Sequence, residues 1–144
     1  MNKDLEKTLL ERYPKILLSS NERNLVAMFG IDCGDGWYNI IDTLCSSIQN
    51  EIDYHNGEGF YSAYESKQPK MEQVVAAQIK EKFGGLRFYT DGSLTDRMRG
   101  MIFLAEALSS VTCERCGGPG KNQSKGWVYT MCDPCYKAFV DKKE

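Results

Sequence analysis

The sequence predicts an α+β fold with a helical N-terminal part, a β-hairpin packed on helices and a small cysteine-rich module at the C-terminus. Apolar residues recur at helical spacing between residues 37 and 52. A glycine pair divides a strand-like stretch at residues 80–89. Four cysteines form two C-x2-C pairs near the end of the chain. We therefore expect an α+β core domain at residues 1–110 and a four-cysteine module at residues 111–144.

The chain has 144 residues, of which 42% are hydrophobic and 26% are charged. This composition is typical of a globular protein, and the length suffices for one core with a small additional module. The first fifteen residues are charged throughout and lack the apolar stretch of a secretory signal. The sequence also lacks a run of about 18 apolar residues. We therefore expect no membrane span and a location in a reducing cytoplasm, where disulfides are rare.

Two helices are expected before residue 57. Residues 4–12 predict a short helix capped by Asn2 or Asp4, which Pro14 then interrupts or restarts. The clearest helix covers the stretch CGDGWYNIIDTLCSSIQNEIDYHNG, with Asp35 as its expected N-cap and Asn56-Gly57 as its end. Its apolar stripe repeats at spacings of four, three, four and four, and consists of Trp37, Ile41, Leu44, Ile48 and Ile52.

A long polar loop rich in aromatic residues is expected over residues 54–70. A loop of this length is uncommon in a compact domain unless it binds something or moves. The chain around this loop carries only negative charge, because seven Asp and Glu residues and no Lys or Arg occur between Arg23 and Lys67. Such a face suits a basic partner, although a solvated acidic helix and loop is the simpler interpretation. The candidate partner-binding residues are Tyr54, Glu58, Phe60, Tyr61, Tyr64 and Glu65.

The stretch IKEKFGGLRFYT has two interpretations. In a hairpin, Gly84-Gly85 forms the two-residue turn and Phe83 faces Leu86. In a helix, apolar residues of 75–83 share one face and Gly84 ends the helix. We favour the hairpin, because LRFYT is strand-like in both cases and needs a partner strand. Its cationic face carries the candidate nucleic-acid-binding residues Lys80, Lys82, Arg87 and Tyr89.

A further helix is expected in the stretch SLTDRMRGMIFLAEALSS, which leads directly into Cys113. Ser93 and Asp96 resemble a capping pair at its start. Apolar residues at helical spacing predict which side of the helix is buried. The expected buried residues are Leu94, Met98, Met101, Ile102, Ala105 and Leu108.

The cysteine quartet has the spacing of a four-cysteine zinc site. Cys113 and Cys116 are two residues apart, fifteen residues follow, and Cys132 and Cys135 repeat the spacing. Zinc takes four ligands at tetrahedral corners, and the glycines after Cys116 let the backbone bend sharply near the metal. A strand candidate, GWVYTM, and a helix candidate after the last cysteine complete the pattern. We expect one structural zinc ion in a treble-clef or zinc-ribbon module.

Other interpretations of the cysteines fit less well. A redox site would use a single C-x2-C beside a βαβ pattern, disulfides are disfavoured in a reducing compartment, and catalytic zinc keeps an open coordination position. The only histidine, His55, is far from the quartet in sequence. Cys45 is interpreted as a small buried apolar residue. Cys33 is interpreted as a buried thiol, with a reactive thiol near a helix N-terminus as the alternative.

Three stretches together carry a resemblance: CGDGWYNIIDTLC, IKEKFGGLRFYTDG and CERCGGPG…GWVYTMCDPC. Their combination resembles a group of small proteins encoded by bacteriophages and prophages, over roughly residues 30–136. The resemblance implies a phage accessory protein with a cysteine-rich C-terminus, located in the cytoplasm of the host bacterial cell. It implies neither a reaction nor a catalytic residue.

Three functions are compatible with these observations. The first is a non-enzymatic binder or inhibitor of a host protein, such as host defence or transcription machinery, with the acidic face and the aromatic loop as contact surface. Under the competing interpretation, the same aromatics cover the core. The second is a nucleic-acid-binding zinc-finger protein, which the net charge of −2 disfavours. The third is an enzyme with an acidic site at Asp32, Asp35 and Asp42 with His55.

Overall fold

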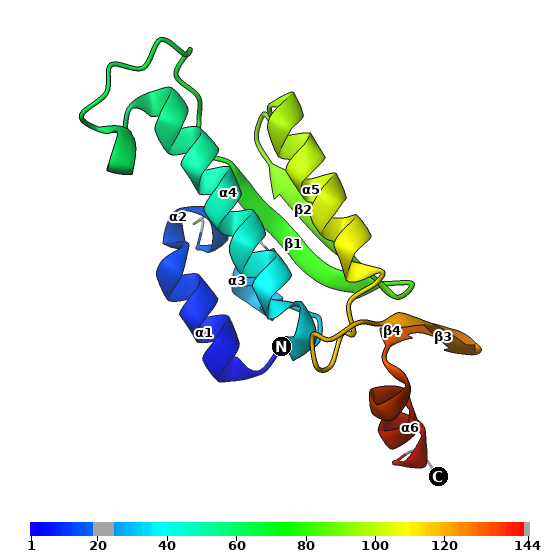
Figure 1. Ribbon diagram of the computed structural model, residues 1–144. Coiled ribbons are helices and arrows are strands. Elements are labelled where there is room, and N and C mark those ends of the chain that lie inside the picture. The colour runs from blue at the N-terminus through cyan, green and yellow to red at the C-terminus, as the bar shows by residue number, and fades with distance from the viewer. Residues whose placement is uncertain (19–24, 143–144) are drawn as a thin grey trace.

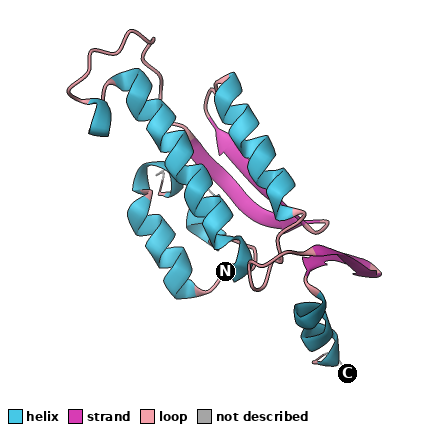
Figure 2. Cartoon of the chain, viewed as in Figure 1, coloured by secondary structure: helices cyan, strands magenta, loops and turns pink. Residues whose placement is uncertain are grey.

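The computed structural model describes residues 1–18 and 25–142 and has the predicted α+β fold (Figures 1 and 2). Helices outnumber strands, and the strands form two separate antiparallel hairpins. The elements in chain order are α1 Lys3–Arg12, α2 Pro14–Leu17, α3 Leu25–Phe29, the 3-10 helix η1 Asp35–Trp37, α4 Tyr38–Asn56, the 3-10 helix η2 Gly59–Tyr61, β1 Val75–Lys82, β2 Gly85–Asp91, α5 Asp96–Ser109, β3 Lys121–Lys125, β4 Trp127–Met131 and α6 Asp133–Asp141.

Helices pack against both strands of the β1–β2 hairpin. α4 and α5 lie side by side in contact, α5 packs on β2, and α2 and α3 contact β1 (Figure 1). An ion pair of 2.9 Å between Arg12 and Asp42 joins α1 to α4. Both edges of the hairpin are occupied: the backbone of Asp32 pairs with β1, while Ser109 and Glu106 side chains accept hydrogen bonds from β2. The core is therefore a hairpin with protected edges.

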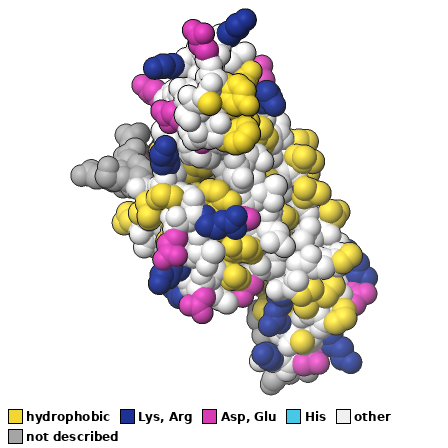
Figure 3. All heavy atoms as spheres, turned by 60° about the vertical axis from the view of Figure 1, so that its left-hand side comes forward, with side chains coloured by type: hydrophobic (Ala, Val, Ile, Leu, Met, Phe, Trp, Pro, Cys, Tyr) yellow, Lys and Arg dark blue, Asp and Glu magenta, His cyan; other side chains and the backbone are white. Residues whose placement is uncertain are grey.

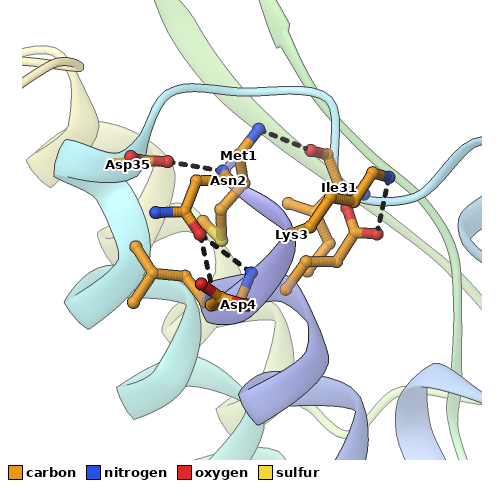
Figure 4. A network of polar contacts seen from close by, with 8 residues as sticks. Met1, Asn2, Lys3, Asp4, Ile31 and Asp35 are labelled. Carbon is orange, nitrogen blue, oxygen red and sulfur yellow. Dashed lines mark hydrogen bonds and ion pairs between the residues drawn. The ribbon is translucent and has the colours of Figure 1, made fainter.

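The central helix α4 buries its predicted stripe, but its predicted cap is wrong. Trp37 and the four stripe residues on α4 are all buried. Asp35 lies in η1, and its Oδ1 accepts a hydrogen bond of 2.7 Å from the Asn2 backbone N–H (Figure 4). α4 begins without a side-chain cap. Asp35 therefore makes a tertiary contact with Asn2 and does not cap α4. The Asn2 side chain caps α1, as predicted.

Strands β1 and β2 form the favoured hairpin, so the helical interpretation of this stretch is wrong. The predicted turn is also wrong by one residue. Lys82 pairs with Gly85, which leaves Phe83 and Gly84 at the turn with φ of 52° and 76°. A two-residue turn of the type I′ class requires positive φ at both positions. Phe83 is consequently 70% exposed and does not face Leu86.

Helix α5 starts differently from its prediction and exposes one predicted core residue. Thr95 is the N-cap, because its Oγ1 accepts a hydrogen bond of 3.1 Å from the Met98 N–H, so the Ser93–Asp96 pair is wrong. Leu108 is 46% exposed, which contradicts its predicted burial. The remaining predicted residues are buried or partly buried against the core, namely Leu94, Met98, Met101, Ile102 and Ala105.

The C-terminal segment contains a cysteine turn, the hairpin β3–β4 and α6, in that order. This is the order of a treble clef, because the second cysteine pair lies at the start of a helix. The segment lies at one end of the molecule, and the loop after α4 lies at the opposite end (Figure 1). The division into a core domain at residues 1–110 and a four-cysteine module at residues 111–144 stays a prediction.

Candidate metal centre and aromatic pocket

Four cysteine sulfurs converge in the C-terminal segment. Cys113 and Cys116 lie in the turn before β3, Cys132 is the N-cap of α6, and Cys135 lies in its first turn. All four sulfurs lie within 4.8 Å of one another, and those of Cys116 and Cys132 are 3.8 Å apart. Ligands about 2.3 Å from a tetrahedral ion are about 3.8 Å apart. The predicted quartet is therefore close enough to hold a metal ion.

The backbone between the first two cysteines forms a tight turn. The Cys113 N–H donates to the Gly118 carbonyl at 2.7 Å, and the Gly117 N–H donates to the Cys113 carbonyl at 2.9 Å. Gly117 has a φ of 76°, which residues with a Cβ rarely adopt. At the second pair, Pro134 occupies the first turn of α6, whose positive dipole end favours thiolates there.

The local electrostatics differ between the thiols of the quartet. Burial opposes ionisation of Cys113, but hydrogen bonds with the backbone N–H groups of Cys132, Cys116 and Arg115 outweigh it and lower its pKa to about 6. The hydrogen bond with Cys132, together with burial, raises the pKa of Cys135 to about 12. Binding of a metal ion would displace the protons that the thiols of the quartet carry.

Glu114 attaches the cysteine turn to the core. Its carbonyl accepts a hydrogen bond of 2.7 Å from the Gly36 N–H, and its Oε1 accepts one of 2.9 Å from the Gly34 N–H. Burial raises the pKa of Glu114, while the hydrogen bond from Gly34 opposes this shift. The Trp37 indole N–H donates to the Thr112 carbonyl at 2.8 Å, beside the first ligand. Three hydrogen bonds thus hold the turn against the segment before α4.

The glycines of the stretch CGDGW are required by this contact. A Cβ at Gly36 would lie 2.1 Å from the Cys113 carbonyl oxygen and 2.6 Å from the Gly117 nitrogen. A Cβ at Gly34 would lie 2.3 Å from the Glu114 carbonyl oxygen. Sequence reasoning gave these glycines no role, although two glycines flanking one acid indicate a close approach of two backbones.

The two cysteines outside the quartet are buried. Cys33 is 7% exposed and Cys45 is fully buried. Burial raises the pKa of each thiol to about 12. Both residues are therefore protonated at neutral pH and inaccessible, as the interpretation of buried thiols predicts, and the alternative of a reactive Cys33 is disfavoured.

Four aromatic rings gather where α4 ends. Tyr54 belongs to α4 and not to the loop, which corrects its predicted place. Its ring centroid lies 5.3 Å from that of Tyr61 at an interplanar angle of 73°, and the Phe60 centroid lies 5.4 Å from Tyr61 at 89°. The Tyr64 centroid is 6.5 Å from Tyr61. Together with Glu65 and the next three residues they line an open cavity of about 530 Å³, the aromatic pocket; its lining residues are Tyr54, Phe60, Tyr61, Tyr64, Glu65, Ser66, Lys67 and Gln68.

The loop that forms the aromatic pocket is attached to α4 at both of its ends. Asn56 accepts a hydrogen bond of 2.8 Å from the Met71 N–H and donates one of 2.9 Å to the Met71 carbonyl. His55 Nδ1 lies 3.0 Å from the Pro69 carbonyl oxygen. Gly57 ends α4 in the left-handed conformation and lets the chain reverse there. The loop therefore returns to the helix that it leaves, which fixes the pocket in place.

Two of the four rings of the aromatic pocket are largely open to solvent, while Tyr61 is partly buried. Phe60 is 81% exposed and Tyr64 is 64% exposed, so these two residues do not cover the core. In the space-filling view, hydrophobic side chains gather at the upper end of the molecule with charged side chains around them (Figure 3). Large exposed aromatic clusters are unusual on proteins that act alone. Whether the candidate partner-binding residues contact a partner stays a prediction.

Several acidic residues between Arg23 and Lys67 form ion pairs with Lys or Arg residues of other elements. Asp42 pairs with Arg12 on α1, and it also accepts a hydrogen bond of 2.8 Å from the Tyr13 hydroxyl. Glu51 is 5% exposed and lies 3.5 Å from an Arg97 nitrogen of α5. Glu58 lies 3.7 Å from Lys15. The acidic face is therefore partly neutralised by neighbouring cations, whereas Glu65 is exposed and forms no ion pair with the residues that the structure describes.

The candidate nucleic-acid-binding residues share one face of the β1–β2 hairpin. Lys80 pairs directly with Arg87, and alternation along the strands places Lys82 and Tyr89 on the same side. The expected face is therefore present despite the shifted register. Lys80 and Arg87 are half-buried, while Lys82 and Tyr89 are exposed. Contact of these residues with nucleic acid stays a prediction.

The residues of the expected acidic enzyme site are not brought together. Asp32 bonds to β1 through its backbone, Asp35 accepts from Asn2, and Asp42 is held by Arg12. His55 lies near the far end of α4, 3.4 Å from Glu51. A helix rises about 1.5 Å per residue, so roughly 25 Å separates the start of α4 from His55. These four residues do not form one constellation.

Among the described residues, no helix is both long enough and apolar enough to cross a membrane.

Comparison with known families and proteins gives no relative to set beside this geometry. No family model matches the chain, no curated protein matches it, and no solved structure matches it.

Proposed function

We propose that this chain is a phage-encoded accessory protein that binds a host protein without catalysing a reaction, and that its C-terminal module holds one structural zinc ion. The aromatic pocket at the end of α4 is the observation that carries the proposal. Host defence nucleases and transcription proteins are the candidate partners, because their nucleic-acid-binding surfaces are basic and suit the acidic surroundings of this pocket.

Zinc is the metal that the four thiols of the quartet favour. Soft thiolate ligands in a tetrahedral arrangement select zinc over hard cations such as magnesium and calcium. Four thiolates also fill the coordination shell and leave no position for a substrate. The zinc ion would therefore stabilise the module, and the partner would bind at the opposite end of the molecule.

Exposed aromatic side chains support the role of a binding surface. Tyrosine and phenylalanine bury large areas at interfaces while losing little side-chain entropy, and a few such anchors supply most of the binding energy. Phe60 and Tyr64 are more than 60% exposed in the isolated chain. A partner that covers them would remove this apolar area from water. The attached loop would lose little freedom on binding, which favours affinity.

A capture experiment tests the binding function. Tagged protein is incubated with a lysate of host cells, and retained proteins are identified by mass spectrometry. Replacement of Tyr61 and Tyr64 together by Ala should abolish capture of the retained partner, because interface anchors contribute about 2 kcal/mol or more each. Zinc content and circular dichroism should be unchanged. Phe103→Ala, at a residue of α5 that is 75% exposed, is the matched control and should retain the partner.

The capture result has a clear contrary outcome. If the double variant and the wild-type chain retain the same proteins equally, the aromatic pocket is not the contact surface and the proposal is wrong. Reversal of charge at Glu65, by contrast, should mainly slow association and weaken its dependence on salt.

Nucleic-acid binding is the second candidate function, and the cationic hairpin face favours it. The directly paired Lys80 and Arg87 place two positive charges side by side, with Lys82 next along the same face. Binding through this face would weaken steeply as salt concentration rises, since counterions are released from the nucleic acid. Tight, salt-sensitive binding of single-stranded DNA that a triple replacement of these three residues by Gln removes would favour this function over the first.

A further inference from the structure

We propose that the aromatic pocket binds the guanidinium group of an arginine side chain presented by the partner. This inference rests on the proposed function and names the chemical group that the same site takes. Three features of the pocket support it: four clustered rings, the Glu65 carboxylate without an ion-pair partner among the described residues, and an excess of negative charge in the chain around it.

The ring cluster has the chemistry of a cation site. The face of an aromatic ring carries partial negative charge and attracts a cation within about 6 Å of its centroid. Tyr54, Phe60 and Tyr64 each lie within 6.5 Å of Tyr61, so one bound group can contact several rings at once. The rings meet at steep angles, between 60° and 89° for the Tyr61 contacts. Rings at these distances and angles contact one another, so a guest group would lie in the cavity that they line, against the ring surfaces that face it.

The charges around the aromatic pocket also favour a cation. Residues 51–68, which include the whole pocket lining, contain four acids and one Lys, which gives a local charge of −3. Two of these acids are already paired, Glu51 with Arg97 and Glu58 with Lys15. Glu65 lines the cavity and forms no ion pair within residues 1–18 and 25–142. Its carboxylate is therefore available to a bound cation.

Arginine fits this combination better than lysine. A guanidinium is planar, so it stacks on an aromatic face and donates two parallel hydrogen bonds to one carboxylate at the same time. A lysine ammonium is a compact and strongly hydrated charge that lacks this geometry. The cavity of about 530 Å³ also exceeds what one ammonium group fills. The pocket size and the Glu65 carboxylate therefore both favour the larger, forked group.

The charge of Lys67 allows a test of whether the bound group is positive or negative. Its side chain lines the same cavity, and its ammonium group repels a bound cation. Removal of this charge should strengthen binding of an arginine side chain, whereas removal of the Glu65 charge should weaken it. An anionic guest would show the opposite pattern for both residues, and an uncharged apolar guest would respond to neither.

The experiment is a titration of the purified full chain, followed through the NMR signals of the tyrosine and phenylalanine rings. The probes are N-acetyl-arginine amide, its neutral citrulline analogue, N-acetyl-lysine amide and tetramethylammonium, each at millimolar concentration. We expect the arginine probe to shift the ring signals of Tyr54, Tyr61 and Tyr64, and the citrulline probe to leave them unchanged. Affinity for arginine should fall about five-fold in Tyr61→Leu. It should fall in Glu65→Gln, rise in Lys67→Gln, and stay unchanged in the control Phe103→Leu.

Several outcomes would overturn the inference. Equal shifts from the arginine and citrulline probes would show that charge is not recognised. Stronger binding of the lysine probe or of tetramethylammonium would assign the pocket to an ammonium group. Ring signals that no probe moves would exclude a cation site. If no probe binds but the Tyr61/Tyr64 variant still loses the captured protein, the binding function stands and only the arginine assignment is wrong. If the arginine probe binds but that variant captures the same protein as the wild-type chain, the pocket is a cation site and the proposed binding function is wrong.

Discussion

Substitution of one glycine should separate the metal module from the core. In Gly36→Ala, the new methyl group would lie 2.1 Å from the Cys113 carbonyl oxygen and 2.6 Å from the Gly117 nitrogen. Both neighbours are backbone atoms of the turn that carries two of the four cysteines, so neither can rotate away. The turn has to move by more than an ångström, and the hydrogen bonds at this contact then break.

The hydrogen bonds at this contact determine how much stability the Gly36→Ala variant should lose. Three hydrogen bonds of 2.7 to 2.9 Å are lost, those donated by Gly36, Gly34 and Trp37. A typical hydrogen bond contributes about 0.5–1.5 kcal/mol net, which gives about 3 kcal/mol for the three. Alanine restricts the unfolded chain and returns about 0.4–1 kcal/mol. We therefore expect Gly36→Ala to lower the free energy of unfolding by about 2–3 kcal/mol.

Urea unfolding of the metal-loaded chain, followed by circular dichroism, measures this change. Gly100→Ala is the matched control, because its Cβ meets nothing within 4 Å on α5. Alanine is a better helix former than glycine, so the control should gain up to about 1 kcal/mol. An unfolding free energy of Gly36→Ala within about half a kcal/mol of the wild-type value would refute the reasoning, since surface substitutions away from any such contact stay within that range.

Three further predictions concern the metal, the core and the turn. Purified protein should contain one zinc ion per chain by elemental analysis, and Cys116→Ser should lose it and unfold the C-terminal segment, because structural zinc supplies folding free energy. Ile48→Ala should lower the free energy of unfolding by about 2–5 kcal/mol, since Ile48 is fully buried; a loss below half a kcal/mol would contradict its burial. Phe83→Asn should raise stability by about 0.5–1 kcal/mol, because Asn tolerates the positive φ of this exposed residue better than Phe; a lower melting temperature would contradict the assigned turn.

Local patterns predicted the elements whose causes are local. The stripe from Trp37 to Ile52 needed only helical periodicity, and every member is buried. The metal quartet needed only cysteine spacing and glycines in the turn, and the four sulfurs converge. The end of α4 at Gly57 and the restart of the chain at Pro14 also follow from single residues with restricted or permissive backbones.

Tertiary contacts decided the features that the sequence could not predict. The hairpin turn shifted to Phe83-Gly84 because Gly84, and not Gly85, approaches β4; its Cβ would lie 3.0 Å from a Val128 methyl carbon. Asp35 bonds to the Asn2 amide instead of capping α4, because α1 folds back beside it. The loop after α4 closes into the aromatic pocket through Asn56 and Met71, which are fifteen residues apart.

Three stretches that are far apart in the sequence meet in space at these contacts. The glycines of CGDGW meet the cysteine turn, Gly84 of KFGG meets β4, and the Thr130 hydroxyl of GWVYTM donates to the Gly84 carbonyl. All three resembling stretches therefore serve one junction between the core and the metal module. The aromatic pocket lies between the first two stretches and belongs to neither. Substitutions in the loop that follows α4 should accordingly leave this junction intact, because no residue of the junction lies in that loop.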